Sequence, residues 1–114
     1  MIGLDLVRVD RIARFREKYG EAGLSRFLNP DEITRAKSDQ SLAGIWAAKE
    51  AVSKALGCGI GGKLGFHDIT IVKNEAGAPE ALLSDKAATL HGVKKLAISI
   101  THEKEFAAAV AIRP

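Results

Sequence analysis

The chain has 114 residues, of which 46% are hydrophobic and 27% charged, and its net charge is +3. This length allows one domain with a modest core, so we expect a single domain over residues 1–114. The composition is too apolar for a disordered chain, and charges interrupt the apolar runs too often for a membrane span. A single cysteine excludes an internal disulfide, and the first residues lack the pattern of a secretion signal, which predicts a cytoplasmic protein.

The first third of the chain predicts one strand and two helices. Residues 2–7 form the strand, which places Asp5 among apolar neighbours that we expect to be buried. An arginine-rich helix follows and ends at Gly20, because glycine readily takes the left-handed conformation that ends helices. Asn29 and the proline after it then begin a short helix that extends to about Lys37.

The rest of the chain predicts one long helix and a set of strands. An alanine-rich run over residues 42–56 is the central helix, which Gly57 ends. The remaining elements are expected at 67–73 (strand), 79–83 (edge strand), 84–92 (helix), and 95–101 and 106–112 (an antiparallel pair). The order β-α-α-α-β-β-α-β-β indicates an α+β fold with helices packed on an antiparallel-rich sheet.

The positive charge is concentrated in the first half of the chain. Residues 1–63 hold 11 basic and 8 acidic residues, whereas residues 64–114 hold 6 of each. In the first helix Ile12, Phe15 and Tyr19 recur at helical spacing and are expected to point inward. The opposite stripe consists of Arg8, Arg11, Arg14 and Lys18. It is either an ordinary solvated face or a docking face for an acidic partner; nucleic acid is not expected, because only 5% of residues are aromatic.

A glycine-rich segment after the central helix matches two phosphate-binding motifs by letter only. Residues 57–62 fit GxGxxG and residues 57–63 fit GxxxxGK. Both motifs require a strand before the loop and a helix after it, whereas this loop leaves a helix, and Leu64 stands where a magnesium-binding hydroxyl is needed. The glycines are better explained by a sharp turn close to another backbone or a ligand.

A small set of polar residues could carry chemistry. An acid inside an apolar strand, as at Asp5, needs a cation, a metal or hydrogen bonds. Glu50 and Lys54 share one face of the central helix, with Trp46 one turn earlier and Ser53 adjacent. Taken alone, the Glu50–Lys54 pair is typical of a helix surface, and His102 is typical of an ordinary turn histidine. Asp5 fits a structural ion pair and a ligand equally well. Alternatively, the two acids meet at a hard cation such as Mg²⁺, with the lysine placed for phosphate oxygens.

Several segments together resemble one family. They are Gly3-Leu4-Asp5-Leu6-Val7 followed by Arg11-Ile12, the run from Leu42 to Gly57 with its AAKEAVSKALG block, and Ile98-Ser99-Ile100-Thr101-His102. In this order they are similar to the bacterial holo-acyl-carrier-protein synthases, which are phosphopantetheinyl transferases. The resemblance covers nearly the whole chain.

The resemblance implies an activity and a set of site residues. The activity is Mg²⁺-dependent transfer of 4′-phosphopantetheine from coenzyme A to a serine of apo acyl carrier protein, leaving adenosine 3′,5′-bisphosphate, in fatty acid biosynthesis. Asp5 and Glu50 would bind Mg²⁺, Glu50 would be the candidate base, and Lys54 would hold a phosphate or protonate the leaving group. The residues expected at coenzyme A are Lys54, Ser53, His102, Trp46 and Gly57.

The resemblance also implies partners. The family forms homotrimers with active sites at subunit boundaries, so His102 and Asp5 of one site are expected from different chains. Acyl carrier proteins are acidic, and Arg8, Arg11, Arg14 and Lys18 would receive them.

One position departs from the family's pattern. Many members have arginine where Ile45 stands, and its absence predicts weaker discrimination between coenzyme A and its 3′-dephospho form. Lys37, Lys49 and Lys63 are the candidates to compensate.

Two other functions remain possible from the residues alone. One is a non-catalytic basic module for RNA or an acidic protein, in which Asp5 and Glu50 are structural. The other is a magnesium-dependent hydrolase that uses the same two acids on a phosphoanhydride.

Overall fold

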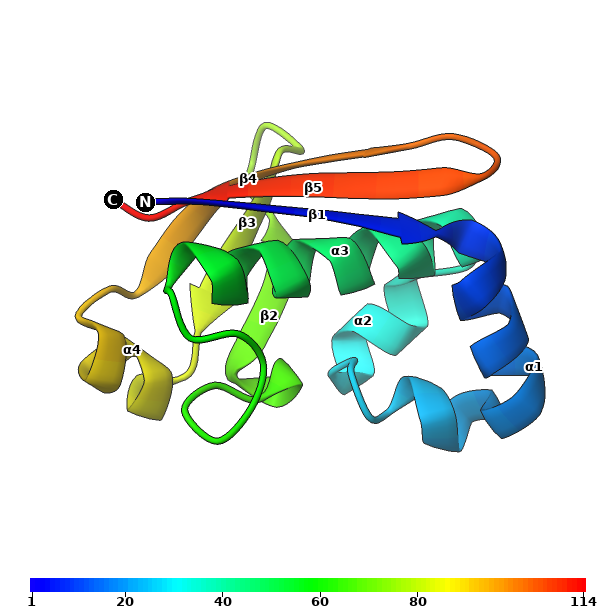
Figure 1. Ribbon diagram of the computed structural model, residues 1–114, viewed down its shortest axis with the longest axis horizontal. Coiled ribbons are helices and arrows are strands. Elements are labelled where there is room, and N and C mark those ends of the chain that lie inside the picture. The colour runs from blue at the N-terminus through cyan, green and yellow to red at the C-terminus, as the bar shows by residue number, and fades with distance from the viewer.

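The computed structural model describes residues 1–114 as an antiparallel five-stranded sheet with one long helix packed across it. The elements are β1 (Ile2–Arg8), α1 (Val9–Leu24), α2 (Pro30–Arg35), α3 (Asp39–Ala55), a 3-10 helix (Phe66–Asp68), β2 (Ile69–Lys73), β3 (Pro79–Leu83), α4 (Asp85–His91), β4 (Lys95–His102) and β5 (Phe106–Ile112). The strand order is β1-β5-β4-β3-β2. Figure 1 shows α3 beneath β1 and β5, with the other helices on the same side of the sheet. The predicted α+β fold is confirmed.

Several boundaries and one sheet position differ from the predictions. The central helix begins at Asp39, three residues before its predicted start at Leu42. The first helical segment continues to Leu24, although Gly20 breaks its regular geometry with φ 58° and ψ −148°. The strand expected from His67 begins at Ile69, because residues 66–68 form the 3-10 helix. The strand at 79–83 is not an edge strand, since β4 returns antiparallel beside it and leaves β1 and β2 at the edges.

The face of β1 that meets α3 is made of small and polar residues. Gly3 and Val7 are buried against the helix, and Asp5 lies on the same side because side chains alternate along a strand. Leu4 and Leu6, which were expected to bury Asp5, point the other way and are each 64% exposed. The position of Asp5 is therefore set by α3 and not by an apolar pocket of its own strand.

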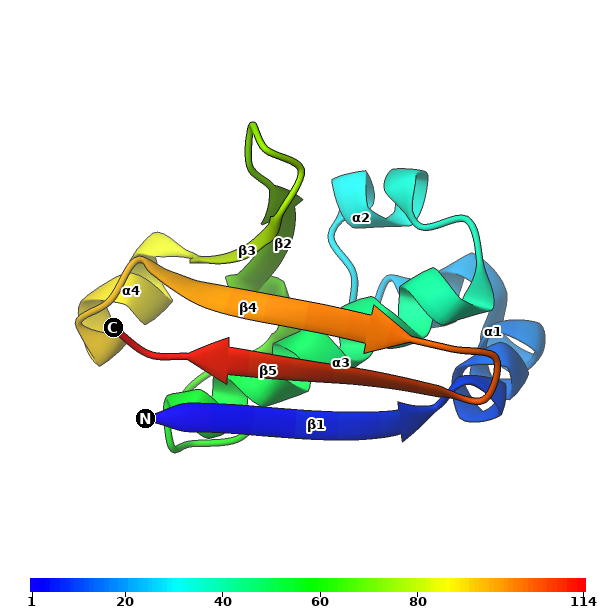
Figure 2. The same ribbon diagram turned by 90° about the horizontal axis from the view of Figure 1, so that it is seen from above.

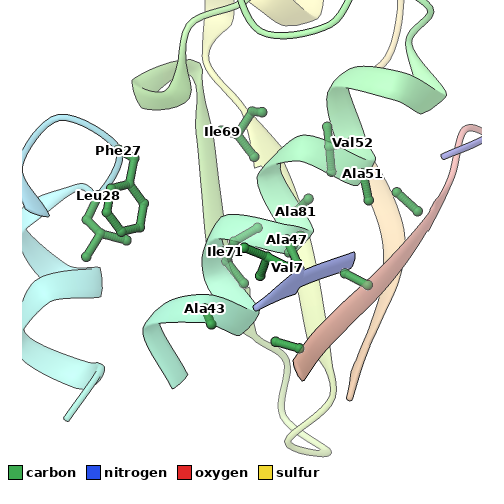
Figure 3. Close-up of a cluster of buried hydrophobic side chains, with 14 of the residues drawn as sticks. Val7, Phe27, Leu28, Ala43, Ala47, Ala51, Val52, Ile69, Ile71 and Ala81 are labelled. Carbon is green, nitrogen blue, oxygen red and sulfur yellow. The ribbon is translucent and has the colours of Figure 1, made fainter. Parts of the chain in front are cut away.

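The core lies between α3 and the sheet. Figure 3 shows Ala43, Ala47 and Ala51 of α3 facing Val7 of β1 and the inward side chains of β2 and β3. These small side chains allow a close approach of helix and strand. The approach leaves no room for a side chain at Gly3, where an added Cβ would lie 1.9 Å from the carbonyl oxygen of Ala51. No helix is long and apolar enough to cross a membrane.

The opposite face of the sheet carries no helix (Figure 2). Ile2, Leu4, Leu6 and Ile112 are between 50% and 68% exposed on this part of the molecule. In register these residues come from adjacent strands, since Ile2 pairs with Ile112. They form an apolar area that we call the open sheet face.

Asp68 joins the 3-10 helix to the start of α4. Its carboxylate accepts hydrogen bonds from the Gly65 N–H at 2.9 Å and the Ser84 hydroxyl at 2.7 Å. The Gly65 hydrogen bond, followed by that of Ser84, lowers the pKa of Asp68. The acid is a structural connector and lies in a different segment from the candidate catalytic residues.

Candidate active site

Asp5 and Lys54 meet where β1 crosses α3. The Lys54 ammonium donates to Asp5 Oδ1 at 3.0 Å and to the Leu4 carbonyl oxygen at 3.0 Å. The Asp5 side chain is 13% exposed, whereas that of Lys54 is 50% exposed. The sequence suggested a pair between Lys54 and Glu50 along the helix, but Lys54 forms its ion pair with the acid of the neighbouring strand.

Glu50 lies beside this pair on α3. Burial raises the pKa of Glu50, and the nearby negative charge of Asp5 raises it further, while Lys54 and Arg11 act in the opposite direction. A cation between the two carboxylates would offset the unfavourable effect of the Asp5 charge on the ionisation of Glu50. Their oxygen donors are those that a hard cation such as Mg²⁺ prefers, so these residues fit the metal that the resemblance implies.

The protein supplies few ligands at this point. No group of three or more His, Cys, Asp or Glu side chains could together hold a metal ion. A cation held by Asp5 and Glu50 would therefore need further oxygen ligands from water or from a bound substrate.

A buried ion pair fixes α3 on the side away from Asp5. Lys49 and Glu32 are both fully buried, and the Lys49 ammonium lies 2.7 Å from Glu32 Oε1 and 2.7 Å from the Phe27 carbonyl oxygen. Glu32 also accepts the Ile71 N–H at 2.7 Å. Burial lowers the pKa of Lys49, and the Glu32 hydrogen bond opposes that shift. This pair was not predicted from the sequence, although Glu32 stands three residues after Asn29, where a capping box places a glutamate.

This pair corrects one expectation. Lys49 cannot replace the arginine that Ile45 lacks, because its ammonium is enclosed and already has acceptors. Lys37 and Lys63 are exposed and remain candidates.

The basic stripe of α1 borders a hollow of about 300 Å³. The hollow is lined by Arg11, Ile12, Arg14, Phe15, Lys18, Tyr19 and Trp46. The Arg11 guanidinium lies over the Trp46 ring, 5.4 Å from its centroid. Tyr19, expected to point inward, is 40% exposed, because α1 reaches past the body of the protein at that end. Arg8 is not part of the hollow; it stacks on Phe106 instead.

Three residues predicted at coenzyme A form no hydrogen bond or ion pair with the side chains of Asp5 or Glu50 in the single chain. His102 is exposed at the end of β4, and β5 separates β4 from β1. Ser53 is 1% exposed and donates its hydroxyl to the Glu50 carbonyl oxygen at 2.7 Å. Gly57 follows α3 with φ 79°, a left-handed conformation that suits glycine. Trp46, the fourth, lies in the basic hollow.

Comparison with known proteins gives one consistent result. The family model described as the 4′-phosphopantetheinyl transferase superfamily matches residues 1–111. A holo-[acyl-carrier-protein] synthase of Nitratiruptor is 52% identical over 112 residues, covering 98% of this chain and 97% of the relative. A synthase of the same name from Wolinella succinogenes is 53% identical over 110 residues, covering 96% and 93%.

Solved structures show the same fold. The holo-[acyl-carrier-protein] synthase of Helicobacter pylori, solved in complex with coenzyme A, has a TM-score of 0.93 and 41% identity, covering 98% of both chains. The synthase of Neisseria meningitidis has a TM-score of 0.86 and 33% identity, covering 98% of this chain and 97% of that one. These matches confirm the resemblance found in the sequence.

Proposed function

Since this chain belongs to the 4′-phosphopantetheinyl transferase superfamily, as a holo-[acyl-carrier-protein] synthase, we propose that it transfers the 4′-phosphopantetheine of coenzyme A to a serine of apo acyl carrier protein. The observation that carries the proposal is the convergence of Asp5 and Lys54 beside Glu50, from two elements far apart in the sequence. The similarity to a synthase solved with coenzyme A supports the choice of donor. We expect the reaction to serve fatty acid biosynthesis in the cytoplasm.

Asp5 and Glu50 would hold a Mg²⁺ ion, with the remaining ligands from water and the donor's diphosphate. The ion would neutralise negative charge that develops on the diphosphate as the bond to the nucleotide breaks. The fit of these residues to such an ion rests on their carboxylate oxygens and on the effect of the Asp5 charge on the pKa of Glu50.

The chain's own side chains would move the proton and hold the anion. The serine oxygen of the carrier attacks the phosphorus that bears pantetheine, and adenosine 3′,5′-bisphosphate leaves with the bonding electrons. Glu50 would accept the serine proton, the role that the resemblance implies for this carboxylate. Lys54 places a positive charge at the diphosphate oxygens.

The basic hollow on α1 is the proposed docking place for the carrier. Arg11, Arg14 and Lys18 present positive charge around the aromatic floor formed with Trp46. Such a face would attract an acidic protein and speed its encounter, with a strong dependence on salt. Arg11 joins this hollow to the catalytic group, since its charge also acts on Glu50.

We also propose the homotrimer, with the open sheet face as its contact. An uncovered apolar area of this kind is typical of a surface that another protein covers. A second chain would supply His102, which lies across β5 from the Asp5 strand of its own chain. Light scattering on wild type and on a Leu4→Lys variant tests this: we expect a trimer that the lysine dissociates, and a wild-type monomer would contradict it.

The transfer itself is tested by mass spectrometry. The protein is mixed with apo acyl carrier protein, coenzyme A and Mg²⁺, and the carrier is examined for the added arm. We expect the adduct with wild type, a loss of at least about 100-fold in rate with Asp5→Asn or Glu50→Gln, and no change with Glu75→Gln, an exposed acid in the β2–β3 turn. An adduct formed equally well in excess chelator would contradict the metal site. Release of the nucleotide without any carrier would indicate the hydrolase.

A further inference from the structure

Lys54 is engaged by Asp5 in the protein alone. Its ammonium has two acceptors, Asp5 Oδ1 and the Leu4 carbonyl oxygen, both at 3.0 Å. It forms no ion pair with Glu50, although the two residues stand four apart on one helix. Asp5 is thus a carboxylate that already has a cation.

The arrangement sets up a competition for Asp5. A metal ion between Asp5 and Glu50 would bring a double positive charge next to the Lys54 ammonium. Two cations at one carboxylate repel each other strongly, because the 13% exposure of Asp5 limits screening by water. Lys54 contacts Oδ1 of Asp5, and a divalent ion at the other oxygen of the same carboxylate would still lie close to the ammonium, so the ion pair opposes metal binding.

Lys54 is free to leave. Half of its side chain is exposed, and its only other partner is the Leu4 carbonyl oxygen. A lysine stem has four rotatable bonds, so the ammonium can turn toward solvent or a bound anion without movement of α3. The element that changes is one side chain, while the backbone that carries it stays in place.

We propose that Lys54 is a resident counter-ion of Asp5 that must be displaced before a divalent ion binds, and that the released ammonium then turns to the donor's diphosphate. This rests on the metal site of the proposed function. Lys54 then has two successive partners, first Asp5 and later the donor's diphosphate. Metal and donor favour each other's binding, because the metal frees the ammonium for the diphosphate and the diphosphate gives the displaced ammonium a new partner.

The test measures Mn²⁺ binding to the protein without donor, by electron paramagnetic resonance of the free ion. Lys54→Met keeps the length of the stem and removes the charge, and we expect it to bind Mn²⁺ more tightly than wild type by on the order of tenfold. Lys54→Arg keeps the charge and is expected to stay close to wild type. Arg11→Met is the matched control for a nearby charge that acts on Glu50 without contacting Asp5, and its gain should be far smaller.

Each result decides the matter. Equal or weaker binding by Lys54→Met, equal gains in Lys54→Met and Arg11→Met, or no binding even to Lys54→Met would overturn the proposal. Asp5→Asn separates it from the proposed function. If Asp5→Asn abolishes binding while Lys54→Met matches wild type, only the displacement is wrong. If Asp5→Asn binds as well as wild type, the ion lies elsewhere and the metal site of the proposed function fails too.

Discussion

Gly3 is expected to be irreplaceable because the backbone of α3 leaves no room for a Cβ at this position of β1. In Gly3→Ala the new Cβ would lie 1.9 Å from the Ala51 carbonyl oxygen and 2.5 Å from the Ala55 nitrogen. An ordinary contact begins near 3.4 Å, so strand and helix would have to separate by about 1.5 Å. Both neighbouring atoms are backbone, so no side-chain rotation relieves the clash.

The consequences for stability and activity can be estimated separately. Overpacking of a core costs about 1–3 kcal/mol when side chains can adjust. Here they cannot, so we expect a loss of at least about 3 kcal/mol, which corresponds to a fall of roughly 10 °C in Tm for a domain of this size. Asp5 lies two residues along the same strand, and a shift of about 1 Å at a reacting group costs about 100-fold in rate.

The assays are thermal unfolding followed by circular dichroism and the carrier-loading reaction. Gly61→Ala is the matched control, because nothing lies within 4 Å of an added Cβ and its backbone is not in the left-handed region. We expect it to behave as wild type. Trimming Ala51 to glycine should not rescue Gly3→Ala, because the clash is with the carbonyl oxygen. A Gly3→Ala protein with unchanged Tm and full activity would refute the reasoning.

Three further predictions concern the rest of the chain. Lys49→Met leaves the buried Glu32 without its cation and should lower the free energy of unfolding, measured with urea, by about 3–5 kcal/mol. Lys49→Met combined with Glu32→Gln should lower it less, and equal losses would contradict a buried ion pair. The backbone and hydroxyl hydrogen bonds of Asp68 lower its pKa, so ionised Asp68 stabilises the fold above the unfolded value of about 3.9, and this stabilisation is lost as pH falls through the folded pKa. Asp68→Asn should therefore flatten the acid side of a curve of unfolding free energy against pH, and an unchanged curve would contradict this. Ile45→Arg should improve discrimination between coenzyme A and its 3′-dephospho form, measured as the ratio of kcat/KM; an unchanged ratio would remove any special role from Ile45.

Local patterns in the sequence determined the elements. Asn29 and Pro30 began α2, Gly57 followed the end of α3, and the alanine-rich run gave the central helix to within three residues. The hydrogen bonds and turns that fix these boundaries are local, so the residues that make them are close in sequence. The candidate residues Asp5, Glu50 and Lys54 were also found from the sequence, and the family resemblance indicated their roles.

Only the tertiary structure decided which residues of different helices and strands contact each other. Helical spacing placed Lys54 and Glu50 on one face, but β1 packs beside this face and Lys54 forms its ion pair with Asp5 of that strand. The same spacing could not show that Lys49 lies fully buried against Glu32, or that β3 is inside the sheet. Periodicity tells which side of an element a residue occupies, whereas its partner depends on which other element packs there, and that depends on the core as a whole.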